Sequence, residues 1–334
     1  MAPLAQGCAA GSHSAGDALV VASVADRGYT VPVAAMLRSV LRTTTAAASV
    51  HLLDMGIAPD DRDRLARICA EGQATLVWYD ARGRAPEQLP LTSRMTRATY
   101  ARLALPRLLP DDVERVIWLD ADVLVACDLT ELWSTDLRGG HLAAVQDPCV
   151  PYVSSRYGVR GWRDLGLEPD AKYFNAGVML VDVARWRNDE VGERAAEYIR
   201  RYRAHCMFWD QEGLNAVLSG QWSELDLRWN YCPAFTPRER PESARVEPAI
   251  LHFAGTLKPW LLPVTADGAR ARFFRVLDET PWAGWRPRRT IASSAKGWYD
   301  DSRVRDVLYP VEHWCMLSVG RRADRVARRL RGAA

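Results

Sequence analysis

Short apolar runs alternate with segments of helical periodicity over the first 120 residues, and this alternation constrains the fold more than any other feature. The expected strands are 18–23, 49–53, 74–79 and 116–119, and the expected helices are 32–41, 60–71 and 93–105. We expect the first helix to begin at Pro32 and the third to close at Pro106. Strands that alternate with helices form a mostly parallel central sheet with helices on both faces, so the sequence predicts an α/β fold.

The rest of the chain is less regular but continues in the same manner. We expect strands at 141–145, 173–181 and 249–253, and helices from about 183 and at 191–204. The first strand carries neither GxGxxG nor GxxxxGK[ST], which removes the main support for a dinucleotide-binding or P-loop protein. No Gly/Ser linker interrupts 18–280, so we predict one domain there, after a disordered leader at 1–17 and before an extension at 281–334.

Asp120-Ala121-Asp122 follows the apolar run 116–119, and it is the strongest chemical signal in the chain. If strand geometry continues, Asp120 and Asp122 point to the same face. Two adjacent carboxylates repel each other, and a hard divalent cation removes that repulsion. We therefore predict a metal-diphosphate site at the carboxyl edge of the sheet, where open α/β sheets bind ligands. A second Asp-x-Asp at 61–63 lies in a charged segment and is expected to be a solvated surface pair.

His252 ends the expected strand 249–253 just as Asp120 ends 116–119. A lone histidine in such a place is more often structural, but an imidazole with two carboxylates suits Mn²⁺ and, less well, Mg²⁺. Lys258 could neutralise a leaving diphosphate, and Gly255 allows close approach of the backbone to an anion. Together these residues are typical of a nucleotide-diphosphate site.

Composition excludes several classes of protein. The net charge of +3 over 334 residues does not favour nucleic-acid binding, and seven scattered cysteines without a CxxC pair indicate neither a disulfide framework nor a zinc site. No apolar run reaches the roughly 18 residues of a membrane span. The leader lacks the basic and apolar regions of a signal peptide. We expect a cytoplasmic protein.

Arginines crowd the last part of the chain, where apolar residues recur at three- and four-residue steps over 309–331. This pattern predicts a basic amphipathic helix, which could bind the anionic inner face of the plasma membrane. The alternative is a helix that packs on its own domain and exposes its arginines to solvent.

Six motifs occur in an order that resembles glycosyltransferase family 8. They are Ala25-Asp26-x-x-Tyr29, Thr99-Tyr100-Ala101-Arg102-Leu103, Leu119-Asp120-Ala121-Asp122, Phe174-Asn175-Ala176-Gly177, Asp210-Gln211, and His252-Phe253-Ala254-Gly255 with Lys258-Pro259-Trp260. The resemblance spans about 18–262 and is greatest to bacterial lipooligosaccharide galactosyltransferases. It implies a GT-A fold and a retaining hexosyltransferase that uses a UDP-sugar such as UDP-galactose or UDP-glucose.

The resemblance also implies a role for individual positions. The metal ligands are Asp120, Asp122 and His252. The donor-binding residues are Val24, Asp26, Tyr29, Thr99, Arg102, Ala121, Asp147, Asn175, Gly255 and Lys258. Gln211, Asp210, Asn175 and Lys258 lie at the reacting centre. The chain departs from the family at Gly28, where the family often has Asn, so one contact to the nucleoside is lost.

Two routes to retention of configuration stay open at this stage. Gln211 is a poor nucleophile, which favours front-face attack with a phosphate oxygen of UDP as the proton acceptor, whereas Asp210 would serve a double displacement. The acceptor would be a saccharide, a glycolipid or a natural product. Two other functions are alternatives: a nucleotidyltransferase, which usually has a Gly-rich basic N-terminal loop that this chain lacks, and a non-catalytic nucleotide-sugar-binding protein.

Overall fold

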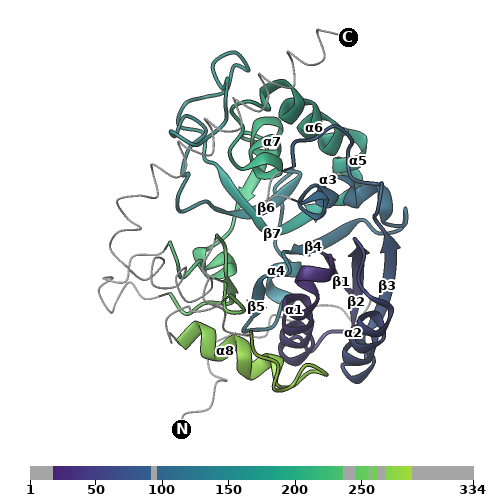
Figure 1. Cartoon of the computed structure of the whole chain (residues 1–334). Coiled ribbons are helices and arrows are strands. Elements are labelled where there is room, and N and C mark those ends of the chain that lie inside the picture. The colour runs from purple at the N-terminus through teal and green to yellow at the C-terminus, as the bar shows by residue number, and fades with distance from the viewer. Residues whose placement is uncertain (1–17, 92–95, 236–245, 256–257, 262–267, 288–334) are drawn as a thin grey trace.

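The computed structural model describes residues 18–91, 96–235, 246–255, 258–261 and 268–287 of the chain (Figure 1). The strands are β1 (Leu19–Ala25), β2 (Ala48–Asp54), β3 (Thr75–Asp80), β4 (Arg115–Leu119), β5 (Val123–Val125), β6 (Leu142–Gln146), β7 (Phe174–Asp182), β8 (Trp222–Glu224) and β9 (Ile250–His252). The helices are α1 (Thr30–Thr43), α2 (Pro59–Glu71), α3 (Arg97–Leu108), α4 (Thr130–Trp133), α5 (Val183–Asn188), α6 (Val191–Tyr202), α7 (Trp209–Val217) and α8 (Gly268–Leu277). Two short 3-10 helices, η1 (Arg27–Tyr29) and η2 (Leu227–Asn230), complete these elements.

A seven-stranded sheet in the order β3-β2-β1-β4-β7-β6-β8 forms the centre of the molecule. The pairs β3-β2, β2-β1, β1-β4 and β6-β8 are parallel, and only β7 runs antiparallel to its neighbours. This confirms the predicted α/β fold with a mostly parallel sheet. The strand order reverses between β1 and β4, and such a switch point opens a crevice at the carboxyl edge of the sheet.

Helices cover both faces of this sheet. Figure 1 shows α1, α2 and α8 on one side and α3, α5, α6 and α7 on the other. Each layer encloses its own apolar cluster, since neighbouring side chains along a strand point to opposite faces. β7 alternates between the two, with Leu180 in one cluster and Val181 in the other. The sheet is therefore buried on both sides, as the apolar runs of the sequence predict.

α8 extends the fold beyond the last strand. Glu279 pairs with Arg38 and Arg42 of α1, and Trp282 is 7% exposed within the core cluster on the α1 side. The packed core therefore includes Trp282, and the half-buried Trp285 packs against it.

Three local expectations need correction. α3 does not close at Pro106 but continues through it to Leu108, although Pro has no N–H to donate to the helix. The chain after β4 leaves strand geometry at Asp120, so Asp120 and Asp122 do not lie on one face of a continued strand. β5 and β9 pair with each other in a separate two-stranded sheet, which the sequence did not predict.

Two predicted segments lie outside the described residues: the leader at 1–17 and the basic helix at 309–331. Within the part of the chain that the structure describes, no helix combines the length and apolar character that a membrane crossing requires.

Candidate active site

Functional side chains collect at one edge of the central sheet. β1, β4 and β6 end there, and they are followed by Asp26, Asp120 and Asp147, respectively. β7 runs in the opposite direction, so its first residues, with Asn175, lie at the same edge. Polar side chains that follow or begin four strands of the sheet therefore meet at its carboxyl edge.

A tight turn, not a strand, brings the two carboxylates of the Asp-x-Asp motif together. The turn is closed by a 3.3 Å hydrogen bond from Val123 N to Asp120 O, and the chain continues directly into β5. Asp120 N donates to Gly177 O at 2.8 Å, and Phe253 N donates to Asp122 O at 3.0 Å. The turn is thus held from β7 on one side and from the chain after β9 on the other.

The pairing of β5 with β9 brings His252 to the same turn. His252 lies opposite Val123 in this small sheet, and one ligand atom each from Asp120, Asp122 and His252 lies within 4.8 Å of the others. His252 Nε2 is 3.4 Å from Asp122 Oδ1. The three predicted metal ligands therefore converge, although they come from two distant segments of the chain.

This group of atoms has the chemistry of a cation site. Asp122 and His252 are 7% and 4% exposed, and Asp122 Oδ1 is buried without a hydrogen-bond partner. A buried carboxylate oxygen without a hydrogen bond is costly, and a divalent cation bound between it, the imidazole and a second carboxylate would satisfy it. The residues present therefore fit Mn²⁺ or Mg²⁺.

Lys258 brings a positive charge to Asp122. Its ammonium group is buried and contacts both Oδ2 of Asp122 and, at 2.6 Å, the carbonyl oxygen of Phe253. Burial alone would raise the pKa of Asp122, but Lys258 and His252 outweigh it and hold the pKa of that carboxyl well below its usual range. Burial likewise opposes the charge on His252, yet Asp122 raises the pKa of that imidazole to about 10.

Arg102 connects Asp120 with the buried carboxylate of Asp210. Its Nη2 donates to Asp120 Oδ1 at 2.8 Å, and its Nη1 donates to the carbonyl oxygen of Ala176. Its Nε lies 2.7 Å from Asp210 Oδ2, but the angle is too poor for a hydrogen bond, so this contact is an ion pair. Burial raises the pKa of Asp210 to about 6, and Arg102 opposes that rise.

Asp147 organises the side chains around it. Its Oδ1 accepts hydrogen bonds from the backbone N–H groups of Cys149 and Val150 at 2.8 and 2.9 Å. Its Oδ2 accepts from Asn175 Nδ2 and Gln211 Nε2 at 2.9 and 3.1 Å. A carboxylate has about four acceptor sites, so the protein itself already occupies the hydrogen-bonding capacity of Asp147.

Asp26 and Tyr29 lie on the other side of the Asp-x-Asp turn, directly after β1. Asp26 Oδ1 accepts from Gly28 N and Tyr29 N, at 2.9 and 3.1 Å, and so caps η1. Tyr29 is 37% exposed, and its ring meets Trp260 edge to face at a centroid distance of 5.9 Å. This exposed ring beside a carboxylate offers a stacking surface with a hydrogen-bond acceptor, as a nucleobase requires.

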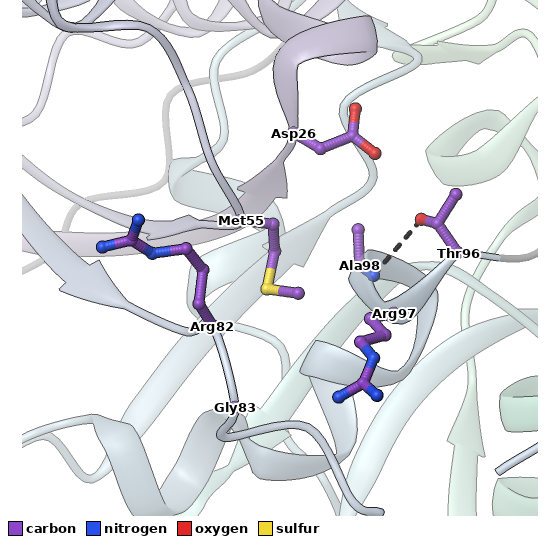
Figure 2. A pocket seen from close by; sticks show the side chains of 7 residues that line it. All are labelled: Asp26, Met55, Arg82, Gly83, Thr96, Arg97 and Ala98. Atoms are coloured by element: carbon purple, nitrogen blue, oxygen red, sulfur yellow. Dashed lines mark hydrogen bonds between the residues drawn. The ribbon is translucent and has the colours of Figure 1, made fainter.

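A cavity of about 340 Å³ adjoins Asp26 (Figure 2). Its lining is Asp26, Met55, Arg82, Gly83, Thr96, Arg97 and Ala98. Figure 2 shows Met55 and the start of α3 facing each other across it, with Asp26 above them. Asp120, Asp122 and His252 are not among the residues that line it.

Four further expected donor-binding residues lie on β1, in the Asp-x-Asp turn, on α3 and after β9. Val24 is buried near the end of β1, Ala121 is buried in the turn, and Thr99 lies in the first turn of α3. Gly255 has φ +78, which favours glycine, and a Cβ there would lie 2.9 Å from the ring of Phe235.

Sequence reasoning missed two residues that contact this site. Trp118 Nε1 donates to Asp120 Oδ1 at 2.9 Å, and Asn230 Oδ1 lies 2.8 Å from His252 Nδ1. Trp118 belongs to an apolar run that predicts only core packing, and Asn230 sits in a short 3-10 helix without any motif. No pattern in the sequence could have identified either one.

Solved structures share this architecture. Two structures of the galactosyltransferase LgtC, an active-site mutant and a complex with donor and acceptor sugar analogues, each align with a TM-score of 0.68 and 28% identity, over 80% of this chain and 99% of theirs. Among curated proteins, general stress protein A of Bacillus subtilis (strain 168) is 29% identical over 78% of this chain and 94% of its own length. Lipopolysaccharide 1,2-glucosyltransferase of Escherichia coli (strain K12) is 24% identical over 67% of each protein.

The match to a family model covers the same region. The model described as glycosyl transferase family 8 matches residues 20–262, which contain all of the motifs and every site residue described above. The chain therefore belongs to glycosyltransferase family 8.

Proposed function

We propose that this protein is a retaining, metal-dependent hexosyltransferase that moves a sugar from a UDP-sugar to a hydroxyl group of a saccharide, glycolipid or natural product. The observation that carries the proposal is the convergence of Asp120, Asp122 and His252 within 4.8 Å, beside the buried ammonium group of Lys258. The likeness to a galactosyltransferase with bound sugar analogues and to a lipopolysaccharide glucosyltransferase supports a hexose donor.

Transfer from a nucleotide sugar requires stabilisation of the leaving diphosphate. A bound Mn²⁺ or Mg²⁺ would supply a Lewis acid for the phosphate oxygens. Lys258 would turn from Asp122 to the diphosphate and neutralise the charge that grows as the glycosidic bond breaks, which is a contribution specific to the transition state. Asp26 and Tyr29 would hold the base, and Val24, Thr99, Ala121 and Gly255 would line the nucleotide.

The side chains near the sugar favour front-face attack. Asp210 is 3% exposed and ion-paired with Arg102, so it is poorly placed to act as a nucleophile. Both ends of the Gln211 amide are engaged, since its Oε1 accepts from Ala176 N at 3.0 Å and its Nε2 donates to Asp147. We infer that these residues position the donor sugar together with Asn175 and that a phosphate oxygen of the leaving UDP accepts the proton of the acceptor hydroxyl.

A panel of UDP- and GDP-sugars with Mn²⁺, scored by nucleotide release and by thermal shift, tests the proposal. We expect release from at least one UDP-hexose and its loss with a chelator. The same sugar should raise the melting temperature, since a ligand at 100 times its Kd stabilises by about 2.7 kcal/mol. If no sugar nucleotide is cleaved, with or without an acceptor, the protein is not a transferase of this class.

The cellular location of the protein requires a separate experiment. We propose a cytoplasmic protein whose segment 309–331 binds the inner face of the plasma membrane, a proposal that comes from the basic amphipathic sequence alone. Full-length protein should co-sediment with anionic vesicles, and protein truncated at Pro310 should not. Equal binding of the two proteins would assign the arginines to a solvated surface.

A further inference from the structure

A continuous chain of buried hydrogen bonds joins the metal ligands to the residues expected around the donor sugar. Asn230 Oδ1 lies 2.8 Å from His252 Nδ1, and Asn230 Nδ2 donates to Asn175 Oδ1 at 2.9 Å. Asn175 Nδ2 in turn donates to Asp147 Oδ2. Asn230 is 1% exposed, so solvent has almost no access to the link in the middle of this chain.

The backbone determines the direction of every bond in it. Gly177 N donates to Asn175 Oδ1 at 3.0 Å, so that atom is an acceptor and the other end of the amide is the donor that faces Asp147. Because Asn175 Oδ1 is an acceptor, the atom of Asn230 that faces it must be the amide nitrogen. The oxygen of Asn230 then faces His252, and Nδ1 of the imidazole must carry a hydrogen.

This arrangement leaves Nε2 of His252 as the ligand atom. Nε2 points to Asp122 Oδ1, on the side where the metal ligands converge. The hydrogen bond at the other ring nitrogen of a ligating histidine normally sets its tautomer and ring orientation. The other group facing Nδ1 is the Cys232 thiol at 3.8 Å, a weak partner compared with an amide oxygen at 2.8 Å.

We propose that Asn230 is a positioning residue that orients His252 for the metal and Asn175 for the donor sugar at the same time. The inference rests on the proposed function and deepens it: cation affinity and recognition of the sugar share one side chain that touches neither ligand. The two hydrogen bonds of the Asn230 amide can be tested separately by substitution, because its oxygen accepts from His252 and its nitrogen donates to Asn175.

Two variants separate the ends. Asn230→Leu removes both hydrogen bonds and keeps the number of side-chain heavy atoms, although its two methyl groups are larger than the amide. Asn230→Asp keeps an oxygen that can accept from His252 Nδ1. It replaces the amide nitrogen with a second oxygen, so the hydrogen bond to Asn175 Oδ1 is lost. The matched control is Tyr79→Phe, which deletes the 2.8 Å partner of Nδ1 in another buried histidine, His51 on β2, away from the site.

Two quantities are measured for each protein without turnover. The first is the affinity for Mn²⁺ in the presence of UDP, from the electron paramagnetic resonance signal of free Mn²⁺. The second is the ratio of the Kd of UDP to that of a 2-fluoro UDP-hexose in the presence of Mn²⁺, which reports the contribution of the sugar.

We expect Asn230→Leu to weaken Mn²⁺ binding by about 10- to 100-fold, the usual effect of removing such a partner, and Tyr79→Phe to leave it unchanged. Asn230→Asp should retain the Mn²⁺ affinity and lose the preference for the sugar nucleotide. A folded Asn230→Leu protein with wild-type Mn²⁺ affinity would overturn the proposal. If that variant does not fold, Asn230→Asp decides, because loss of both properties or of neither contradicts it.

The wild-type protein distinguishes this inference from the proposed function. If wild type binds no Mn²⁺ with UDP, the proposed function fails. If wild type binds both and the variants behave like it, only the role of Asn230 is wrong.

Discussion

The ammonium group of Lys258 contacts Oδ2 of Asp122, a carboxylate 136 residues earlier in the chain. Both side chains are buried, so the ion pair forms where water screens charge poorly. Asp122 is also an expected metal ligand, so a bound cation would compete with Lys258 for its carboxylate.

This competition predicts opposite effects of Lys258→Met on binding and on turnover. The affinity for Mn²⁺ without nucleotide should rise, because Asp122 loses its competing ammonium group. Transfer should fall by about 100-fold, the usual effect of removing one group that stabilises developing charge. Calorimetric Mn²⁺ titration and nucleotide release measure the two quantities. Weaker Mn²⁺ binding by the variant would show that Lys258 supports the metal site instead of competing with it.

Asp120→Asn should reduce transfer by about 100-fold or more at ordinary Mn²⁺ concentration. The amide keeps an oxygen that can accept from Arg102 and Trp118 but loses the negative charge toward the cation, so we expect little change in the melting temperature. Asp63→Asn is the control, because it alters the second Asp-x-Asp, whose residue 63 is exposed on α2. Near-normal transfer by Asp120→Asn would remove the metal from the mechanism.

Gly177→Ala should displace His252. A Cβ at this position would lie 2.2 Å from Cε1 of the imidazole, so the ring must leave its observed place. We expect weaker Mn²⁺ binding and a lower melting temperature. Gly268→Ala at the start of α8 is the control, since its Cβ meets nothing within 4 Å and Ala should be neutral or slightly stabilising. Unchanged Mn²⁺ affinity in Gly177→Ala would mean that the ring is not needed at its observed place.

The raised pKa of Asp210, about 6 in the folded protein against 3.8 ordinarily, predicts how stability depends on pH. The folded state binds more protons than the unfolded state between these values, so the contribution of Asp210 to stability falls as pH rises from about 4 to 6. Asp210→Asn does not titrate. The melting temperature of the variant minus that of wild type should therefore be more positive at pH 7.5 than at pH 4.5, as measured by thermal denaturation.

The opposite change in that difference would show that the ion pair with Arg102 outweighs the burial of Asp210. In that case the pKa of Asp210 would be depressed, and its ionised form would stabilise the fold above pH 4.

The local pattern of the chain was sufficient to predict the α/β class and most of its strands. The run 116–119 is apolar because β4 is buried on both faces, and 60–71 is charged because α2 exposes most of its surface. Such patterns can be read from a few consecutive residues, because the burial of a strand or of one helix face determines which of its residues are apolar. The pairing of β5 with β9 has no such pattern, since each strand has only three residues.

The residue types of the site were also evident in the sequence, because two carboxylates, an imidazole and a lysine have few roles together besides binding a cation and phosphate. Only the tertiary structure decided how they meet: by a turn at Asp120–Val123, by the β5-β9 pair that carries His252, and by Asn230 behind it. The physical reason is that side-chain chemistry belongs to each residue, whereas distance and hydrogen-bond direction depend on segments that are remote in the chain.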